Sequence, residues 1–311
     1  MHRMVTLDSV LYHMVGMLLR FLGGLPRGVR WFLATFFGRL LFAVDRKHRR
    51  IALGNLQMAF GAEKSRRECF AIARRVFENL GHIIFEIGWA QRQNPSQLAG
   101  HFTVSGLEEY QRAIDKKKGV LFLVAHFGNW ELLPFIGYLC RIPVGIVYRP
   151  LDTPFLDRFF KESRSRYGGH TIPTRRGAMR QIYKELKRGN SVAMLMDQNV
   201  DWYEGVFVDF FSHRACTNTG MAWLALKSGA PVVPAFIVRT PEGFHTALGP
   251  ELPLIRTGDP TKDVELNTAQ YNRVIELYAR RFPAQWFWVH QRWKTRPYQP
   301  WPRQKRKIKR K

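Results

Sequence analysis

This chain of 311 residues has little cysteine, little negative charge and no long uninterrupted apolar run. Its three cysteines, Cys69, Cys140 and Cys216, form no C-x-x-C unit, which excludes a disulfide framework and a cysteine zinc site. So few cysteines favour a reducing compartment. No apolar run reaches the ~20 residues that a spanning helix needs, so the sequence does not predict a clean transmembrane segment.

Several catalytic motifs are also absent from the sequence. It contains no G-x-S-x-G nucleophile elbow, no H-E-x-x-H zinc motif and no phosphate-binding P-loop. We therefore expect neither a metal nor another cofactor. The missing elbow also argues against a covalent serine intermediate, so any group transfer is expected to be direct.

The shortage of negative charge leaves a strongly basic chain, with 24 acidic against 49 basic residues and a net charge of +25. Seven of the basic residues lie in a tail at 301–311 that we expect to be disordered, and the others are spread along the chain. Such a charge attracts nucleic acid, anionic lipid head groups or an acidic carrier protein. Because the basic residues are scattered and form no reading helix, we do not expect nucleic acid as a partner.

Residues 9–44 are mostly apolar but are interrupted by Arg20, Arg27, Arg30 and Arg39. Aromatic residues make up 14% of the chain, and aromatic rings favour membrane interfaces. We expect residues 1–46 to form an N-terminal hydrophobic helical anchor, either an interfacial hairpin or one tilted helix. A signal peptide is disfavoured because no small-residue cleavage site follows a compact apolar core. Two ordinary helices covering the core remain the alternative.

The rest of the chain, residues 47–300, alternates short apolar runs with helical patterns and is expected to form one domain. Residues 47–92 read as helices. Apolar runs typical of buried strands follow at 120–125, 144–148, 171–173, 192–196 and 232–238. Helical patterns lie at 130–140, 154–167, 178–188, 219–228 and 262–282. This alternation predicts an α/β fold with a largely parallel, mixed central sheet flanked by helices.

Polar residues follow four of the expected strands. They are His126, Arg149, the pair Arg175 and Arg176, and the pair Asp197 and Gln198. In an open α/β sheet, functional groups gather beyond the carboxyl ends of the strands. The sequence therefore predicts one site on one edge of the sheet, built from separate parts of the chain.

The segment His126-Phe-Gly-Asn-Trp-Glu131 carries the candidate catalytic residues. Glu131 falls about one turn into the helix expected after the strand, so its carboxylate is predicted to orient the His126 ring. A neutral imidazole held in this way takes a proton from an alcohol. The backbone N–H groups near Gly128 and Asn129 are predicted to hold an oxyanion. A hydrogen-bonded histidine without a catalytic role is the alternative that the spacing alone leaves open.

The order of several further motifs gives the chain a resemblance to a known family. They are Tyr148-Arg-Pro150, Arg175-Arg-Gly177, Asp197-Gln198, the segment 205–211, Thr217-Asn-Thr-Gly220 and the segment 229–234. Together with the segment from His126 to Glu131, they resemble the late acyltransferases of lipid A biosynthesis, the lauroyl and myristoyl transferases. That family belongs to the wider group with a His-x4-Asp/Glu motif, and the resemblance covers roughly residues 10–295.

The resemblance implies a glycerolipid-acyltransferase-like fold and a specific reaction. Such enzymes move a fatty acyl chain from acyl-acyl carrier protein, or from acyl-CoA, to a hydroxyl of a lipid A precursor in lipopolysaccharide biosynthesis. They work at the cytoplasmic face of the bacterial inner membrane, whose anionic lipids are expected partners. His126 is implied as general base and Glu131 as its partner. The residues expected at the substrate are Gly128, Asn129, Arg149, Arg164, Arg176 and Asp197, the last as a structural carboxylate holding an arginine or a loop.

Three other functions fit parts of the sequence. The first is acyl transfer to another acceptor, such as a mannoside or an ornithine lipid, because no residue pattern specifies the acceptor. The second, of another class, is a basic nucleic-acid-binding protein, which the apolar N-terminal segment disfavours. The third is a membrane scaffold without activity, which the intact pair of His126 and Glu131 disfavours.

Overall fold

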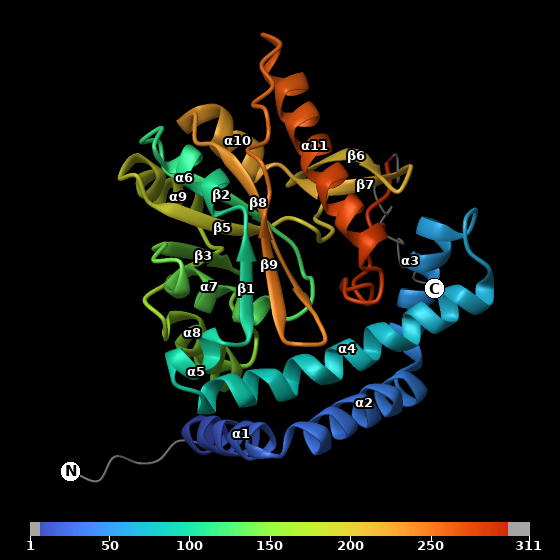
Figure 1. Cartoon of the computed structure of the whole chain (residues 1–311). Coiled ribbons are helices and arrows are strands. Elements are labelled where there is room, and N and C mark those ends of the chain that lie inside the picture. The colour runs from blue at the N-terminus through green and yellow to red at the C-terminus, as the bar shows by residue number, and fades with distance from the viewer. Residues whose placement is uncertain (1–6, 298–311) are drawn as a thin grey trace, which may run out of the picture.

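The structure is a computed structural model that describes residues 7–297 (Figure 1). Four helices come first: α1 (Leu7–Gly24), α2 (Arg27–Val44), α3 (Arg46–Phe60) and α4 (Arg66–Arg92). The later helices are α5 (Pro95–Ala99), α6 (Leu107–Ile114), α7 (Leu133–Leu139), α8 (Pro154–Ser165), α9 (Ala178–Lys187), α10 (Gly220–Ser228) and α11 (Pro260–Arg281). A short 3₁₀ turn, Trp130–Leu132, precedes α7. The basic tail expected at 301–311 lies outside the described residues.

A seven-stranded mixed sheet forms the centre of the fold, in the order β1-β9-β8-β2-β5-β3-β4. Its strands are β1 (Phe102–Ser105), β2 (Val120–Val124), β3 (Val144–Tyr148), β4 (His170–Pro173), β5 (Ser191–Leu195), β8 (Val232–Arg239) and β9 (Phe244–Leu248). All neighbours pair in parallel except β8 with β9. A separate antiparallel hairpin is formed by β6 (Gly205–Phe210) and β7 (His213–Asn218). The predicted α/β fold with a mostly parallel, mixed sheet is confirmed.

Strand β2 is buried along its whole length because both faces of the sheet are covered. Leu121 and Leu123 point to one face and join the apolar cluster that includes residues of α10 and α11. Phe122 and Val124 point to the other face, into a second cluster. A strand buried on both sides needs apolar residues at every position, which explains why β2 reads as a continuous apolar run.

Helices α1 and α2 lie against α4, which crosses below the sheet in Figure 1. Glycines allow the backbones to approach closely: a Cβ at Gly88 of α4 would lie 2.0 Å from Leu19 O of α1. A Cβ at Gly81 would likewise lie 2.1 Å from Ala34 O of α2. The two N-terminal helices are therefore docked on the domain through small residues.

The expectation of an N-terminal hydrophobic anchor is not supported in its spanning form. Among residues 7–297, no helix combines the length and the apolar character needed to cross a membrane. The sequence predicted two apolar helices here, and two are present, but their inner faces pack on α4.

Candidate active site

His126 and Asp197 face each other just beyond the ends of neighbouring strands. Val124 of β2 pairs with Leu195 of β5, and continuing that register by two residues brings His126 opposite Asp197. His126 Nδ1 lies 2.8 Å from Asp197 Oδ1, and the His126 backbone N–H donates to Asp197 Oδ2 at 2.9 Å. The indole N–H of Trp286 donates to the same Oδ2 at 2.8 Å.

Asp197 is a charged, fixed partner for the imidazole. It is only 3% exposed, and burial opposes its charge. The charge and hydrogen bonds of His126 and the hydrogen bond from Trp286 outweigh that effect and hold the pKa of the Asp197 carboxyl below its ordinary value. A carboxylate at Nδ1 keeps the proton on that nitrogen, so Nε2 carries the lone pair of a general base.

Glu131 does not fill the role of orienting His126 that the sequence predicted. It accepts two hydrogen bonds from Arg164, at 2.8 Å from Nε and 2.6 Å from Nη2, and a third from Trp130 at 3.1 Å. Burial disfavours the charge on Arg164, but Glu131 more than compensates and raises the pKa of that guanidinium. The physical reason for the difference is that the 3₁₀ turn points Glu131 towards α8, while β5 supplies the carboxylate for His126.

Gly128 and Asn129 hold the turn after β2 in place and do not line the cavity beside His126. The Gly128 N–H, predicted to hold an oxyanion, donates instead to Gln285 O at 3.0 Å. The Asn129 side chain is fully buried and donates to Ile83 O and to Glu86 of α4. The Gly128 N–H and the Asn129 amide NH₂ group are therefore used inside the protein, and neither residue lines the cavity.

A cavity of about 1170 Å³ opens at His126 and brings several predicted residues together. His126, Glu131, Arg149 and Arg164 line it, whereas Asp197 lies behind His126. Arg176 is exposed and is not part of the lining. Asp197 was predicted to contact substrate or to hold an arginine or a loop; it holds His126 and Trp286 instead.

The deep part of the cavity is apolar and runs along one face of the sheet beneath α7. Its lining comprises Phe122, Val124, Leu133, Ile136, Ile142, Val144, Ile146, Ala193, Ala235 and Leu248. Val144 pairs with Ser191, which pairs with Val120. The cavity thus extends from the level of Val124 to that of Val120, about 13 Å at the usual rise of a strand. Its shape suits an extended aliphatic chain whose reactive end lies at His126.

Three residues near the C-terminus complete the site and were not singled out from the sequence. Trp286 holds Asp197, the Phe287 ring lies 5.6 Å from the His126 ring, and His290 lines the cavity. Asn55 of α3 fixes this stretch by donating to the carbonyls of Trp288 and His290. The sequence pattern that could have indicated these residues is the cluster of three tryptophans around a histidine in the segment 286–293.

The residues described show no metal centre. Within residues 7–297, no group of three or more histidine, cysteine, aspartate or glutamate side chains is placed to hold a metal ion.

Comparison of the sequence with known proteins identifies its family. Residues 2–295 match the family model described as bacterial lipid A biosynthesis acyltransferase. The chain is 30% identical over 276 residues to a lipid A biosynthesis palmitoleoyltransferase of Escherichia coli K12, covering 88% of this chain and 87% of that protein. It is 30% identical over 277 residues to the lipid A biosynthesis lauroyltransferase of the same organism, covering 88% of each.

A more distant relative has a name that states a different acyl acceptor. A phosphatidylinositol mannoside acyltransferase of Mycolicibacterium smegmatis is 25% identical over 199 residues, covering 63% of this chain and 64% of that protein. All three relatives transfer acyl groups, as their names state, and the family model spans nearly the whole sequence. The chain therefore belongs to the bacterial lipid A biosynthesis acyltransferase family and is an acyltransferase.

Proposed function

We propose that this acyltransferase moves a fatty acyl chain from a thioester donor to a hydroxyl of a lipid A precursor. The observation that carries the proposal is the placement of His126, oriented by Asp197, at the opening of a deep apolar cavity. The names of the relatives support lipid A as the acceptor.

The geometry supports a direct transfer. With the acyl chain in the cavity, His126 Nε2 takes the proton of the acceptor hydroxyl while that oxygen attacks the thioester carbonyl carbon. The carbonyl electron pair moves to its oxygen, giving a tetrahedral intermediate. When the C=O bond re-forms, the C–S bond breaks and the leaving thiolate takes the proton from His126. Asp197 stabilises the imidazolium that forms between these steps.

We propose acyl-acyl carrier protein as the donor, with acyl-CoA as the alternative. Both donors end in a phosphopantetheine arm, which carries a negative charge. Arg149 and Lys294 line the cavity, as do Asp152, Asp201 and Glu204, but among residues 7–297 neither cation forms an ion pair with a carboxylate. Unpaired cations at this position favour a phosphate-bearing arm.

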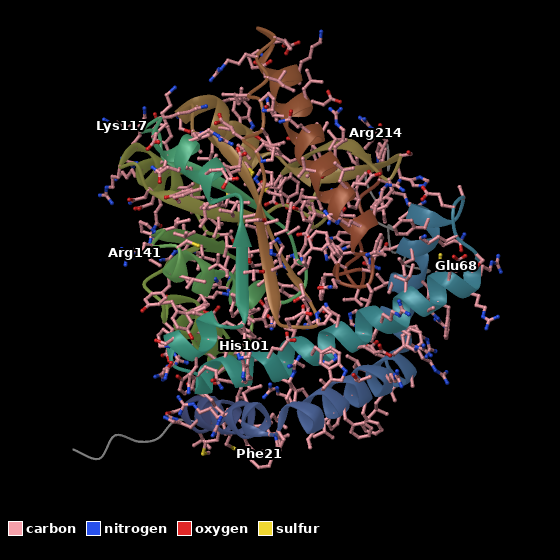
Figure 2. The ribbon with its side chains drawn as sticks, viewed as in Figure 1. Phe21, Glu68, His101, Lys117, Arg141 and Arg214 are labelled. Atoms are coloured by element: carbon pink, nitrogen blue, oxygen red, sulfur yellow. The ribbon has the colours of Figure 1, made fainter. Side chains whose placement is uncertain are left out.

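We propose that the protein works at the cytoplasmic face of the bacterial inner membrane, attached through the outer faces of α1 and α2. Large apolar side chains cover these faces, and Figure 2 shows Phe21 pointing away from α4. The exposed set is Leu7, Val10, Met14, Met17, Leu18, Phe21, Val29, Trp31, Phe32, Phe36, Phe37, Leu40, Leu41 and Val44. An apolar face beside basic residues binds in the plane of an anionic bilayer.

A triple substitution tests this attachment. Replacing Phe21, Phe32 and Phe36 with glutamine should weaken binding to vesicles at least tenfold, because burying each ring contributes about 1.5–3 kcal/mol. Sedimentation with vesicles containing anionic phospholipid measures the partition. The matched control replaces the exposed Leu107, Leu266 and Leu277, on other helices, with glutamine. Equal binding by both triple variants and the wild type contradicts attachment through α1 and α2.

Ala193 is expected to set the usable depth of the cavity. It lies on β5 between Phe122 of β2 and Ile146 of β3, and all three line the cavity at one level. Ala193→Phe should lower kcat/KM for a hexadecanoyl donor about 100-fold and leave an octanoyl donor within about threefold. Ala193→Val should have an intermediate effect. Unchanged chain preference in both variants contradicts this route for the acyl chain.

Mass spectrometry of lipid A tests the proposed function as a whole. Cells that lack the gene should lose one acyl chain from lipid A, and the wild-type gene should restore it, but the His126→Ala gene should not. An unchanged lipid A pattern, together with loss of an acyl chain from another glycolipid, favours the alternative acceptor that the mannoside relative suggests.

A further inference from the structure

A second histidine in the cavity is held as firmly as His126. His290 lines the cavity, and its Nε2 accepts a hydrogen bond from the Asn199 backbone N–H at 2.8 Å. Its carbonyl accepts from Asn55 at 2.6 Å. Because the side chain and the backbone are both fixed, the ring has a defined orientation.

One short segment positions both imidazoles. Asp197 holds Nδ1 of His126, and Asn199, two residues later, holds Nε2 of His290. From the other side, Phe287 N–H donates to His126 O at 3.1 Å, and His290 lies three residues further along that segment. Both residues therefore line the same cavity, with opposite ring nitrogens engaged.

The hydrogen bond from Asn199 fixes the tautomer of His290. A backbone N–H can only donate, so Nε2 of His290 must accept and cannot carry a proton. The neutral ring then carries its proton on Nδ1. No described residue accepts a hydrogen bond from this Nδ1, and it is not among the enclosed polar atoms that lack a partner. An accessible N–H on a residue that lines the cavity is available to substrate.

The charge state agrees with that tautomer. Burial lowers the pKa of His290 to about 4, and the charges of Arg292, His126 and Lys294 act in the same direction against the opposing effect of Asp197. His290 is therefore a neutral hydrogen-bond donor at physiological pH, unlike His126, which has to accept a proton.

The transfer reaction needs such a donor. The Gly128 N–H, one of the backbone donors in the turn after β2, is used by Gln285 O. The negative charge on the carbonyl oxygen of a tetrahedral intermediate requires a fixed donor in a site with little water.

We propose that His290 is a further catalytic residue, whose Nδ1–H donates a hydrogen bond to the thioester carbonyl oxygen as that oxygen becomes negative. The proposal rests on the acyl transfer proposed above. The acceptor oxygen forms its bond to the carbonyl carbon, the carbonyl pair moves to the oxygen that His290 contacts, and the pair returns as the C–S bond breaks. His290 keeps its proton throughout, and His126 moves the proton.

Two isosteric variants separate this role from a structural one. In His290→Asn the amide nitrogen takes the place of Nδ1, so the donor is kept and the partner of Asn199 is lost. In His290→Gln the amide group reaches the place of Nε2, so a partner for Asn199 is kept and the donor at Nδ1 is lost. A purely structural role makes the glutamine variant the better enzyme, and a donor role makes the asparagine variant the better enzyme.

The experiment measures kcat and KM of the purified full chain with dodecanoyl-acyl carrier protein and with dodecanoyl-CoA. We expect His290→Ala and His290→Gln to lower kcat about 10²–10³-fold with KM nearly unchanged, and His290→Asn to recover at least tenfold. His213, whose Nε2 contacts the Met58 carbonyl outside the cavity, provides the matched control, and its asparagine and glutamine variants should retain full kcat. A glutamine variant as active as the asparagine variant, or all variants near wild-type kcat, overturns the proposal.

Nitrogen NMR of the imidazole tests the arrangement without any activity. At pH 7 we expect the neutral tautomer of His290 with the proton on Nδ1. A proton on Nε2, or a charged imidazolium, overturns the proposal. A wild-type chain that folds and shows this tautomer but transfers no acyl group to any lipid contradicts the proposed function, not the tautomer of His290.

Discussion

Asp197→Asn should lower kcat for acyl transfer by about 10³–10⁴-fold while the protein stays folded. The reason lies in the two oxygens of the carboxylate. Oδ2 accepts from the His126 backbone N–H and from Trp286, so the amide oxygen of asparagine must take that place. The amide NH₂ then faces His126 Nδ1, which must accept, and the proton of the ring moves to Nε2. A histidine with its proton on Nε2 cannot act as the base.

Steady-state kinetics, with circular dichroism to confirm folding, measure this effect. Asp263→Asn is the control, since Asp263 is a buried carboxylate that accepts from Thr257 and does not line the cavity. In a His126→Ala background, Asp197→Asn should have little additional effect, because the two residues act as one unit. A kcat within tenfold of wild type for Asp197→Asn rules out Asp197 as the residue that orients the base.

The sequence predicted His126 as the base and Glu131 as its partner, whereas the structure pairs His126 with Asp197. Glu131 is close to His126 along the chain, and sequence spacing favours local pairs. Asp197 is 71 residues away and becomes a neighbour only because β2 and β5 pair in parallel with Val124 opposite Leu195. The edge of the sheet was predicted to gather these residues, but the strand order, which decides which pairs touch, is not contained in the local pattern.

The strands also divide into those that the sequence predicted and those that it did not. Strands β2, β3, β4, β5 and β8 were predicted from their apolar runs. The signal is strongest in β2 and β8, which are buried at nearly every position because both faces are covered. The short strands β1 and β9 were missed, since three of the four residues of β1 and two of the five residues of β9 are exposed or half-exposed, and their apolar runs are short. The segments that form the β6–β7 hairpin were used only as motifs of the family resemblance, and no strands were predicted there.

Likewise, the glycines of α1, α2 and α4 gave no sign of being contacts between helices until the helices were placed together. The apolar residues 9–44 were predicted to bury one face in a membrane; the structure shows that an inner face of these helices packs on α4. Small residues therefore account for the packing against the domain, and the large residues remain on the outer faces.

Glu131 is expected to act through Arg164. The two side chains are 8% and 16% exposed, and the guanidinium also lies over the rings of Tyr148 and Phe160. Glu131→Ala leaves that buried charge unpaired, so we expect the free energy of unfolding to fall by about 3–5 kcal/mol. Transfer should fall at least 100-fold, because the released guanidinium no longer has a fixed place in the cavity.

Arg164→Lys decides between this role and direct action of Glu131 on the substrate. Lysine keeps the positive charge but cannot make the two parallel hydrogen bonds to Glu131. If Glu131 works by fixing the guanidinium, Arg164→Lys should lower kcat about as much as Glu131→Ala. A lysine variant with nearly full activity beside an inactive Glu131→Ala would instead place the Glu131 carboxylate in contact with the reacting groups. The control is Glu78→Ala, which breaks the ion pair of Glu78 with the exposed Arg39 and should change stability by less than about 1 kcal/mol.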